Sequence, residues 1–140
     1  MIDLLSGIQS TSAALSAERT RLDVIGENIA NAHVTRGVDG KPYQRKVVVF
    51  ETALQDALNG GETSATVRVA RIQKDDRPFQ LVHLPGHPDA DASGMVAMPN
   101  VNIHEEMADL IAASRAFEAN LAVVRNARTL AMQTLAIGKR

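Results

Sequence analysis

Apolar residues recur with a helical period at both ends of the chain. In residues 1–31, leucine or isoleucine stands at every seventh position, at Ile8, Leu15, Leu22 and Ile29. This spacing predicts one long helix with an apolar stripe along one side. Thr11 and Glu18 interrupt the stripe.

The C-terminal segment, residues 101–140, carries a longer pattern. Alternating steps of four and three separate its stripe positions, which are Ile103, Met107, Leu110, Ser114, Phe117, Leu121, Val124, Arg128, Ala131 and Leu135. The pattern predicts a second long helix. Asn102 followed by Glu105 is a capping-box signature, and the terminal Lys139 and Arg140 suit the macrodipole at a helix C-terminus.

Residues 32–100 differ from both ends and predict short strands joined by long loops. β-branched residues concentrate in 45–51, a period of two marks 66–73, and 78–84 is a third candidate strand. The stretch that begins with PGHP (85–88) is predicted to be loop. The expected fold class is mainly α with a small β or extended insert, divided into segments 1–31, 32–100 and 101–140.

The two apolar stripes predict how the helices pack. Folding the chain back lets the terminal helices bury their stripes against each other as an antiparallel coiled coil. With both termini at one end, a residue at position i is expected to face one near 139 − i, give or take a turn. Ile8 is then expected near Ala131, Ile29 near Leu110, and Thr11 beside Arg128. Glu18 is expected near Leu121, within a turn of Arg125, where an ion pair is possible. Two helices cannot enclose a core, so we expect neighbouring subunits to supply the missing surface.

Composition excludes several classes of function. The 140 residues include 15 basic and 16 acidic side chains, giving a net charge of −1, which argues against a nucleic-acid partner. The absence of cysteine excludes disulfides and thiol chemistry. No apolar run approaches the roughly 18–20 residues that span a bilayer, and MIDLLSGIQS is not expected to be a cleavable signal peptide.

Candidate chemistry is sparse. HEEMA (104–108) begins like a zinc-protease motif, but Ala108 stands where the second histidine ligand is required. A loop contains His83, His87, Asp89 and Asp91, which are residue types that hold divalent ions, although turn chemistry alone also explains such a loop. No phosphate loop or nucleophile motif is present, so we expect neither an enzyme nor a cofactor.

Two polar motifs resemble the bacterial flagellar rod and hook family. NIANAHVTRG (28–37) resembles the family motif at the end of the first helix, through Asn28, Ala30, Asn31, Thr35 and Gly37, although Glu27 stands where many members have serine. The last helix resembles the C-terminal pattern of the family, through Glu106, Met107, Ser114, Arg115, Phe117, Ala119, Asn120, Leu135 and Gly138. Residues 42–51 and 84–107 resemble the short, proximal-rod branch of the family, so the resemblance covers nearly the whole chain.

The resemblance implies a structural role and specific partners. Members are exported unfolded by the flagellar type III apparatus and assemble in the periplasm into the rod, the drive shaft between the membrane ring and the hook. Their terminal helices pack as a coiled coil around the export channel. Expected partners are further copies of the chain, other rod proteins, the adaptor between membrane ring and rod base, and the export apparatus.

The residues expected to serve assembly and helix packing combine both stripes with the polar motif. They are Ile8, Leu15, Leu22, Asn28, Ile29, Asn31, Thr35, Gly37, Met107, Leu110, Phe117, Asn120, Leu121, Val124 and Leu135. In the motif, Asn and Thr can cap the helix end, and Gly37 is expected to let the chain reverse.

Two other hypotheses remain at this point. The chain could be a soluble coiled-coil adaptor or secretion chaperone, which should form a small, well-folded oligomer. Alternatively, it could be a metal-dependent hydrolase that uses the loop at 83–91, which a metal analysis would test.

Overall fold

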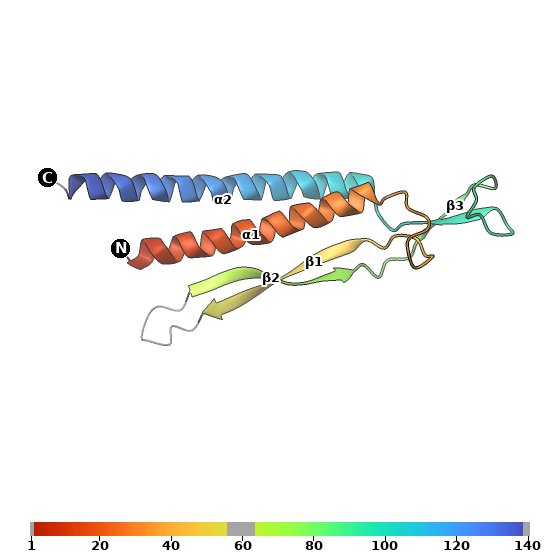
Figure 1. Ribbon diagram of the computed structural model, residues 1–140, viewed down its shortest axis with the longest axis horizontal. Coiled ribbons are helices and arrows are strands. Elements are labelled where there is room, and N and C mark those ends of the chain that lie inside the picture. Colours follow the sequence, from red (N-terminus) through yellow and green to blue (C-terminus); the bar gives the residue numbers. More distant parts are fainter. Residues whose placement is uncertain (1, 56–63, 139–140) are drawn as a thin grey trace.

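Two long helices and a β-hairpin run side by side in the computed structural model, which describes residues 2–55 and 64–138 (Figure 1). The elements in chain order are α1 (Ile2–Ala30), β1 (Lys46–Gln55), β2 (Ser64–Lys74), β3 (Gln80–His83), β4 (Met95–Met98) and α2 (Ile103–Ile137). The expectation of two terminal helices around a small β insert is confirmed.

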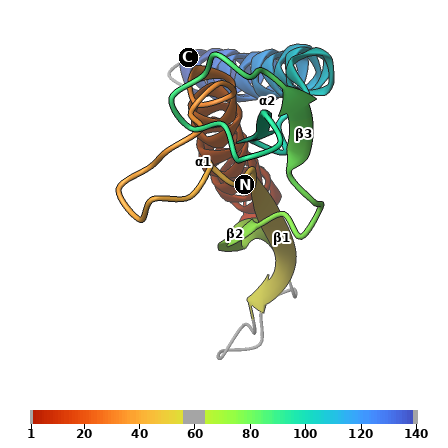
Figure 2. The same ribbon diagram turned by 90° about the vertical axis from the view of Figure 1, so that its right-hand side faces the viewer.

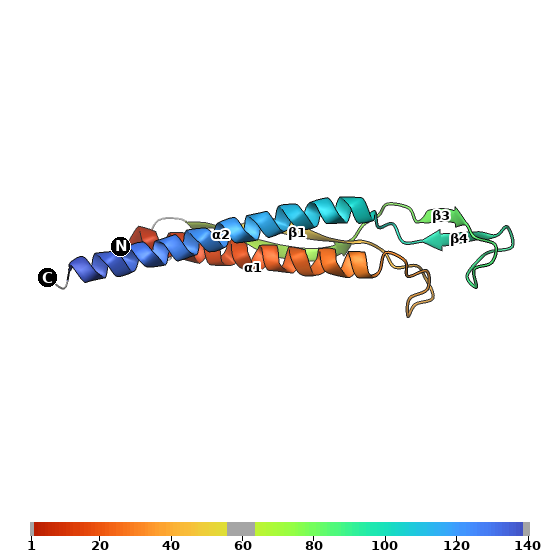
Figure 3. The same ribbon diagram turned by 90° about the horizontal axis from the view of Figure 1, so that it is seen from above.

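The helices run antiparallel, and each ends where its sequence signals a stop. The backbone N–H and the side-chain amide of Asn31 both donate to the Glu27 carbonyl, which closes the last turn of α1. Asn102 caps α2 by accepting a hydrogen bond from the His104 N–H, as the capping signature predicted. Helix α2 is longer than α1, and its C-terminal end extends beyond the start of α1 (Figures 1 and 3).

The β1–β2 hairpin forms a third layer. Viewed along the long axis, α2, α1 and the hairpin are stacked in that order, and α1 contacts both of its neighbours (Figure 2). The strands pair antiparallel, with a bulge that leaves Ala70 without a partner on β1. The hairpin therefore covers one side of α1, a cover that the sequence did not predict, and completion by neighbouring subunits stays a prediction.

A second, smaller sheet lies at the far end of the molecule from the chain termini. Strand β3 corresponds to the predicted strand at 78–84, but β4 lies in a stretch of which only a loop was expected. Gly94 precedes β4 with a φ of +74°, in the left-handed region that favours glycine. A Cβ at Gly94 would lie 3.0 Å from the Pro85 Cβ, so glycine is also required for space.

The register of the helices differs from the expected one. The Asn28 side chain contacts Glu106, more than one turn before the Leu110 expected beside Ile29. Thr11 donates to the Gly7 carbonyl of its own helix, and the nearest cation to Glu18 is Arg21, at 3.9 Å. Glu18 therefore does not form the possible ion pair with Arg125, whereas the position of Thr11 beside Arg128 stays a prediction.

The core is small and rich in short side chains. Among the residues whose burial the structure describes, the buried hydrophobic ones are Ala17, Val24, Ile25, Ala32, Val96, Val101 and Ala113. The chain exposes 10010 Å² of surface, whereas a compact monomer of 15.0 kDa exposes about 7000 Å². The excess reflects an elongated chain whose helices are only partly covered.

The close packing at Ala113 gives a test of the helix contact. Ala113 is fully buried, whereas the adjacent Ala112 is exposed on the same helix. We expect Ala113→Leu to lower the free energy of unfolding by about 1–3 kcal/mol through overpacking, and Ala112→Leu to change it by less than about 0.5 kcal/mol. Thermal unfolding followed by circular dichroism measures both; equal melting temperatures would contradict the contact.

Candidate functional site

Asn28 lies at the centre of a buried polar junction between the helices and the start of the hairpin. Its side chain is 1% exposed. The amide nitrogen donates to the Lys46 carbonyl at 2.9 Å, and the amide oxygen accepts from the Lys46 N–H at 2.9 Å. A carboxamide carries one donor and one acceptor edge, so Asn28 pairs with Lys46 as a neighbouring strand would. The Tyr43 hydroxyl also donates to the Asn28 oxygen, at 2.9 Å.

The junction contains a fully buried carboxylate. Glu106, in the first turns of α2, is 0% exposed. One carboxylate oxygen accepts from Asn28 at 3.0 Å, and the other accepts from the Arg45 Nε at 2.6 Å. Since a buried charge is tolerated only when it is paired and hydrogen-bonded, these contacts fix α1, α2 and the segment before β1 to one another.

Arg45 extends the junction to the segment that follows β2, at the open end of the hairpin. Its guanidinium lies 3.2 Å from an Asp75 oxygen and 3.5 Å from an Asp109 oxygen. Asn100 accepts from the Arg45 backbone N–H at 2.7 Å and donates to the carbonyls of Asp75 and Arg77. Five separate segments of the chain therefore meet in one hydrogen-bonded network.

The junction shifts the pKa of two of its groups. Burial, together with the negative charges of Glu27 and Glu106, raises the pKa of Tyr43 to about 12. Burial alone would raise the pKa of Asp75, but hydrogen bonds from Arg77 and Arg45 outweigh it and hold that pKa below its ordinary value. Asp75 thus remains charged and Tyr43 remains neutral at physiological pH.

The remaining polar residues of the 28–37 motif have different roles. The Thr35 hydroxyl donates to Asp89 at 2.8 Å and so ties this segment to the loop before β4. Gly37 is not in the left-handed region; the residue in this turn with positive φ is Gly40, at +74°. A Cβ at Gly37 would lie 3.2 Å from an Asp39 side-chain oxygen, a tight contact that a small shift of this exposed side chain relieves, so the predicted reason for Gly37 is corrected.

The apolar residues expected on α1 lie beside the buried face rather than on it. Ile8, Leu15, Leu22 and Ile29 are all half-buried. The fully buried side of α1 carries Ala17, Val24, Ile25 and Asn28. Because α1 is covered on two sides, by α2 and by the hairpin, its most buried side lies between these two contacts.

Most positions of the expected stripe on α2 are half-buried. Leu110, Phe117, Leu121 and Val124 are half-buried, as is Asn120. The fully buried residues of α2 are Glu106 and Ala113, each one position before an expected stripe residue, Met107 and Ser114. Met107 is 53% exposed and Leu135 is 62% exposed. Their predicted role in assembly is not tested by their exposure in the single chain.

Sequence reasoning missed three central residues of the junction, Arg45, Asn100 and Glu106. Glu106 belongs to the family-like C-terminal pattern, but an acidic residue in a first helical turn is also explained by the macrodipole. The family-like pattern was the sequence signal that could have revealed Glu106, because it includes Glu106 and not the neighbouring Glu105. The macrodipole explains both glutamates equally well and does not separate them.

The loop at 83–91 does not gather its candidate ligands. Asp91 accepts hydrogen bonds from Ser93 and from the Met95 N–H, as in an Asx turn, and these bonds hold its pKa below the ordinary value. Asp89 contacts Thr35, Arg36 and His87. Within residues 2–55 and 64–138, no three His, Asp or Glu side chains converge as a metal site would require.

Glu106 and its neighbour Glu105 form a matched pair for testing the junction. Glu105 is half exposed and contacts Arg77 at the surface. We expect Glu106→Gln to lower the free energy of unfolding by about 1.5–3 kcal/mol, because two charge-assisted hydrogen bonds are lost in a buried site. Glu105→Gln should cost no more than about 1 kcal/mol. Chemical denaturation measures both values, and equal losses would show that burial of Glu106 contributes nothing.

Tyr43 reports on the junction spectroscopically. It is the only tyrosine, and the chain lacks tryptophan, so phenolate absorption in the ultraviolet monitors this residue alone. A raised folded pKa means that the folded state holds the phenol proton more tightly, so stability declines as pH rises from the unfolded pKa, near 10, toward about 12. We expect titration near 12 in the folded chain and near 10 in denaturant; a midpoint near 10 in both would exclude the buried hydroxyl.

No helix in the described part of the chain is long and apolar enough to cross a membrane. Residues 8–37 match the family described as flagella basal body rod protein, and residues 92–137 match the flagellar basal body rod FlgEFG protein C-terminal family. The first match ends at Gly37, and the second includes the whole of α2 and therefore Glu106.

Curated relatives match almost the full chain. A flagellar basal-body rod protein FlgC of Yersinia enterocolitica is 43% identical over 99% of this chain and 100% of the relative. FlgC of Borreliella burgdorferi is 41% identical over 96% of this chain and 97% of its own length, and FlgC of Bacillus subtilis is 38% identical over 92% and 94%. The chain therefore belongs to the FlgC family of flagellar basal-body rod proteins.

Proposed function

We propose that the chain is a structural subunit of the proximal rod, part of the drive shaft between membrane ring and hook, and surrounds the export channel with its terminal helices. Family membership supports the structural role. The observation that carries the assembly role is the exposure of apolar side chains around the C-terminal half of α2. A helix with apolar side chains on several sides is normally one that is buried on those sides when the protein functions.

The exposed residues of α2 form a stripe suited to a neighbouring helix. Val123, Leu130 and Ile137 are spaced by seven residues and are 54%, 57% and 77% exposed. Helix α1 does not cover them, and α2 extends beyond the start of α1 (Figure 1). We infer that helices of adjacent subunits cover this stripe and complete a coiled coil that the single chain leaves open.

The proposed partners and location follow from this role. The chain contacts further copies of itself, other rod proteins and the adaptor at the rod base, and it meets the flagellar type III export apparatus during secretion. It resides in the periplasmic part of the flagellar basal body.

An adaptor or secretion chaperone is the alternative function. A soluble adaptor would have to cover its own apolar surface, whereas this chain leaves large apolar side chains of α2 in solvent. This exposure favours the rod subunit, because a subunit of a permanent assembly gains its cover only when the assembly forms.

Charges on the exposed stripe test the proposal. We expect Val123→Asp and Leu130→Asp to leave the helical circular dichroism of the chain unchanged, since both positions are exposed. In cells that lack the wild-type gene, both variants should fail to restore rods and swimming, because burying an unpaired carboxylate costs several kcal/mol.

Ala92→Asp, in an exposed loop, adds the same charge away from α2 and is the control, which should restore swimming. Electron microscopy of isolated basal bodies and swimming in soft agar give the two readouts. Normal rods built from the Leu130→Asp variant would contradict burial of this stripe in the assembly.

A further inference from the structure

A pocket beside the buried junction combines positive charge with apolar walls. It has a volume of about 360 Å³ and lies where the segment after α1 meets the open end of the β1–β2 hairpin (Figure 1). The residues that line it come from this segment, from both strands of the hairpin and from the segment before β3. We call it the lysine pocket, and its lining includes Val34, Val38, Lys41, Lys46, Lys74 and Phe79.

The lysines of the pocket carry positive charge that the chain compensates only in part. Lys46 forms an ion pair with Glu27. Lys41 and Lys74 are exposed, and neither forms an ion pair within residues 2–55 and 64–138. Among the described residues that line the pocket, Asp39 is the one carboxylate, and it accepts from the backbone N–H of Lys41 rather than from its ammonium group.

The hairpin places two of these cations against each other. Lys46 and Lys74 are direct partners across β1 and β2. Like charges at directly opposite positions of two strands are destabilising. Because Glu27 contacts Lys46 and not Lys74, a carboxylate from outside the chain is the group that would compensate Lys74.

The apolar part of the pocket distinguishes a protein segment from a free anion as its occupant. Val34 and Phe79 are half-buried and form part of the wall. Val38 lines the same pocket and is fully exposed. An apolar side chain is stabilised only when another apolar surface covers it, and a small inorganic anion offers no such surface.

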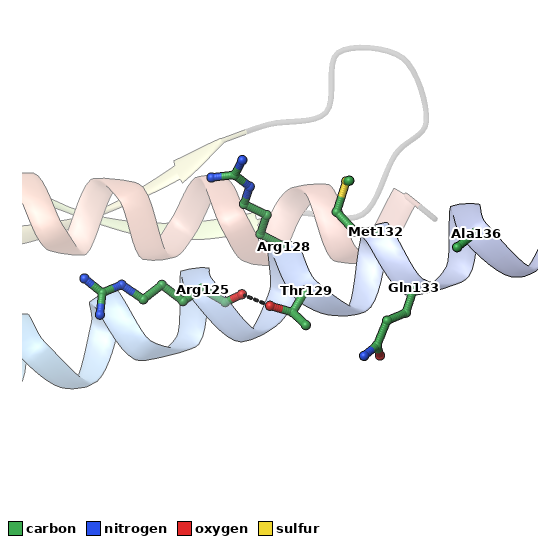
Figure 4. A pocket seen from close by; sticks show the side chains of 6 residues that line it. All are labelled: Arg125, Arg128, Thr129, Met132, Gln133 and Ala136. Atoms are coloured by element: carbon green, nitrogen blue, oxygen red, sulfur yellow. Dashed lines mark hydrogen bonds between the residues drawn. The ribbon is translucent and has the colours of Figure 1, made fainter.

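A larger hollow on α2 does not combine these features. It measures about 610 Å³, and its lining includes Arg125, Thr129 and Met132 (Figure 4). Residues of α2 alone line it, so it is an open side of one helix rather than a site formed by several segments. It belongs to the half of α2 that adjacent helices are proposed to cover.

We propose that the lysine pocket binds an acidic side chain of an adjoining rod subunit, together with an apolar side chain beside it in that subunit. The carboxylate enters beside Lys41 and Lys74, and the apolar side chain packs on Val38 and Phe79. This inference rests on the proposed role in the rod. It adds a charged contact at the end of the molecule opposite the C-terminus of α2 (Figure 1).

Charge reversals separate this contact from folding. We expect Lys74→Glu to keep the melting temperature of the chain at or above the wild-type value, because an opposite-charge pair with Lys46 replaces a like-charge pair. In cells that lack the wild-type gene, the same variant should fail to restore rods and swimming, because its carboxylate repels the acidic partner. Arg71→Glu, an exposed charge reversal on the same strand outside the pocket, is the matched control and should restore both.

Carbodiimide cross-linking of isolated basal bodies tests the contact directly. The reagent joins a lysine amine to a carboxylate in contact with it, through an amide bond and with net loss of water. We expect mass spectrometry to find Lys41 or Lys74 joined to an aspartate or glutamate of another chain. A variant with both Lys41→Arg and Lys74→Arg keeps the two charges, so it should restore rods but lose this cross-link, because a guanidinium is not coupled.

The outcomes separate this contact from the rod role on which it rests. Rods that contain the chain but yield no cross-link from Lys41 or Lys74 to another chain, as expected if a free anion fills the pocket, would overturn the contact. Normal swimming of the Lys74→Glu variant would overturn it too. Basal bodies without the chain would instead overturn the proposed function.

Discussion

The carboxylate of Glu106 imposes the main constraint on this fold. A fully buried carboxylate is stable only if its environment supplies donors and a counter-charge, and here α1 supplies Asn28 while the segment before β1 supplies Arg45. Since the two donors come from different segments, burying one charge fixes where both of them lie. The position of the hairpin beside α1 and the register of the helices at this end follow from that requirement.

The same requirement explains why Asn28 stands inside a helix of otherwise ordinary composition. Its carboxamide pairs with the N–H and the carbonyl of Lys46, so a helix side chain provides the edge that begins the hairpin. An apolar residue would leave both backbone groups buried and unpaired. Asn100 acts in the same way, because it accepts from the Arg45 backbone N–H and donates to the Asp75 carbonyl. In the junction, side chains thus take the place of backbone hydrogen-bond partners.

The sequence predicted the parts of this structure that depend on local signals. Periodicity located both helices, Asn102 and Asn31 marked their ends, and β-branched runs located β1 and β2. The side of each helix that is buried was predicted less well, because periodicity cannot tell a helix covered on one side from one covered on two. The short β4 escaped prediction because its position depends on Gly94 and on pairing with β3, which are tertiary features.

The candidate site was likewise predicted only where the signal was local in the sequence. The polar motif at 28–37 was noticed through its resemblance, but its partners Arg45, Asn100 and Glu106 are far away in sequence, and a single sequence does not say which distant polar groups meet. Polar contacts at one end of the molecule are satisfied within the chain, whereas the apolar surface of α2 toward the other end is not. Directional hydrogen bonds can fix a junction in a single subunit, but apolar area is stabilising only when another surface covers it. The geometry of one end is therefore set within the single chain, whereas burial of the apolar surface toward the other end depends on what the chain binds. A subunit of a larger shaft requires both, a preformed part and a surface that is covered on assembly.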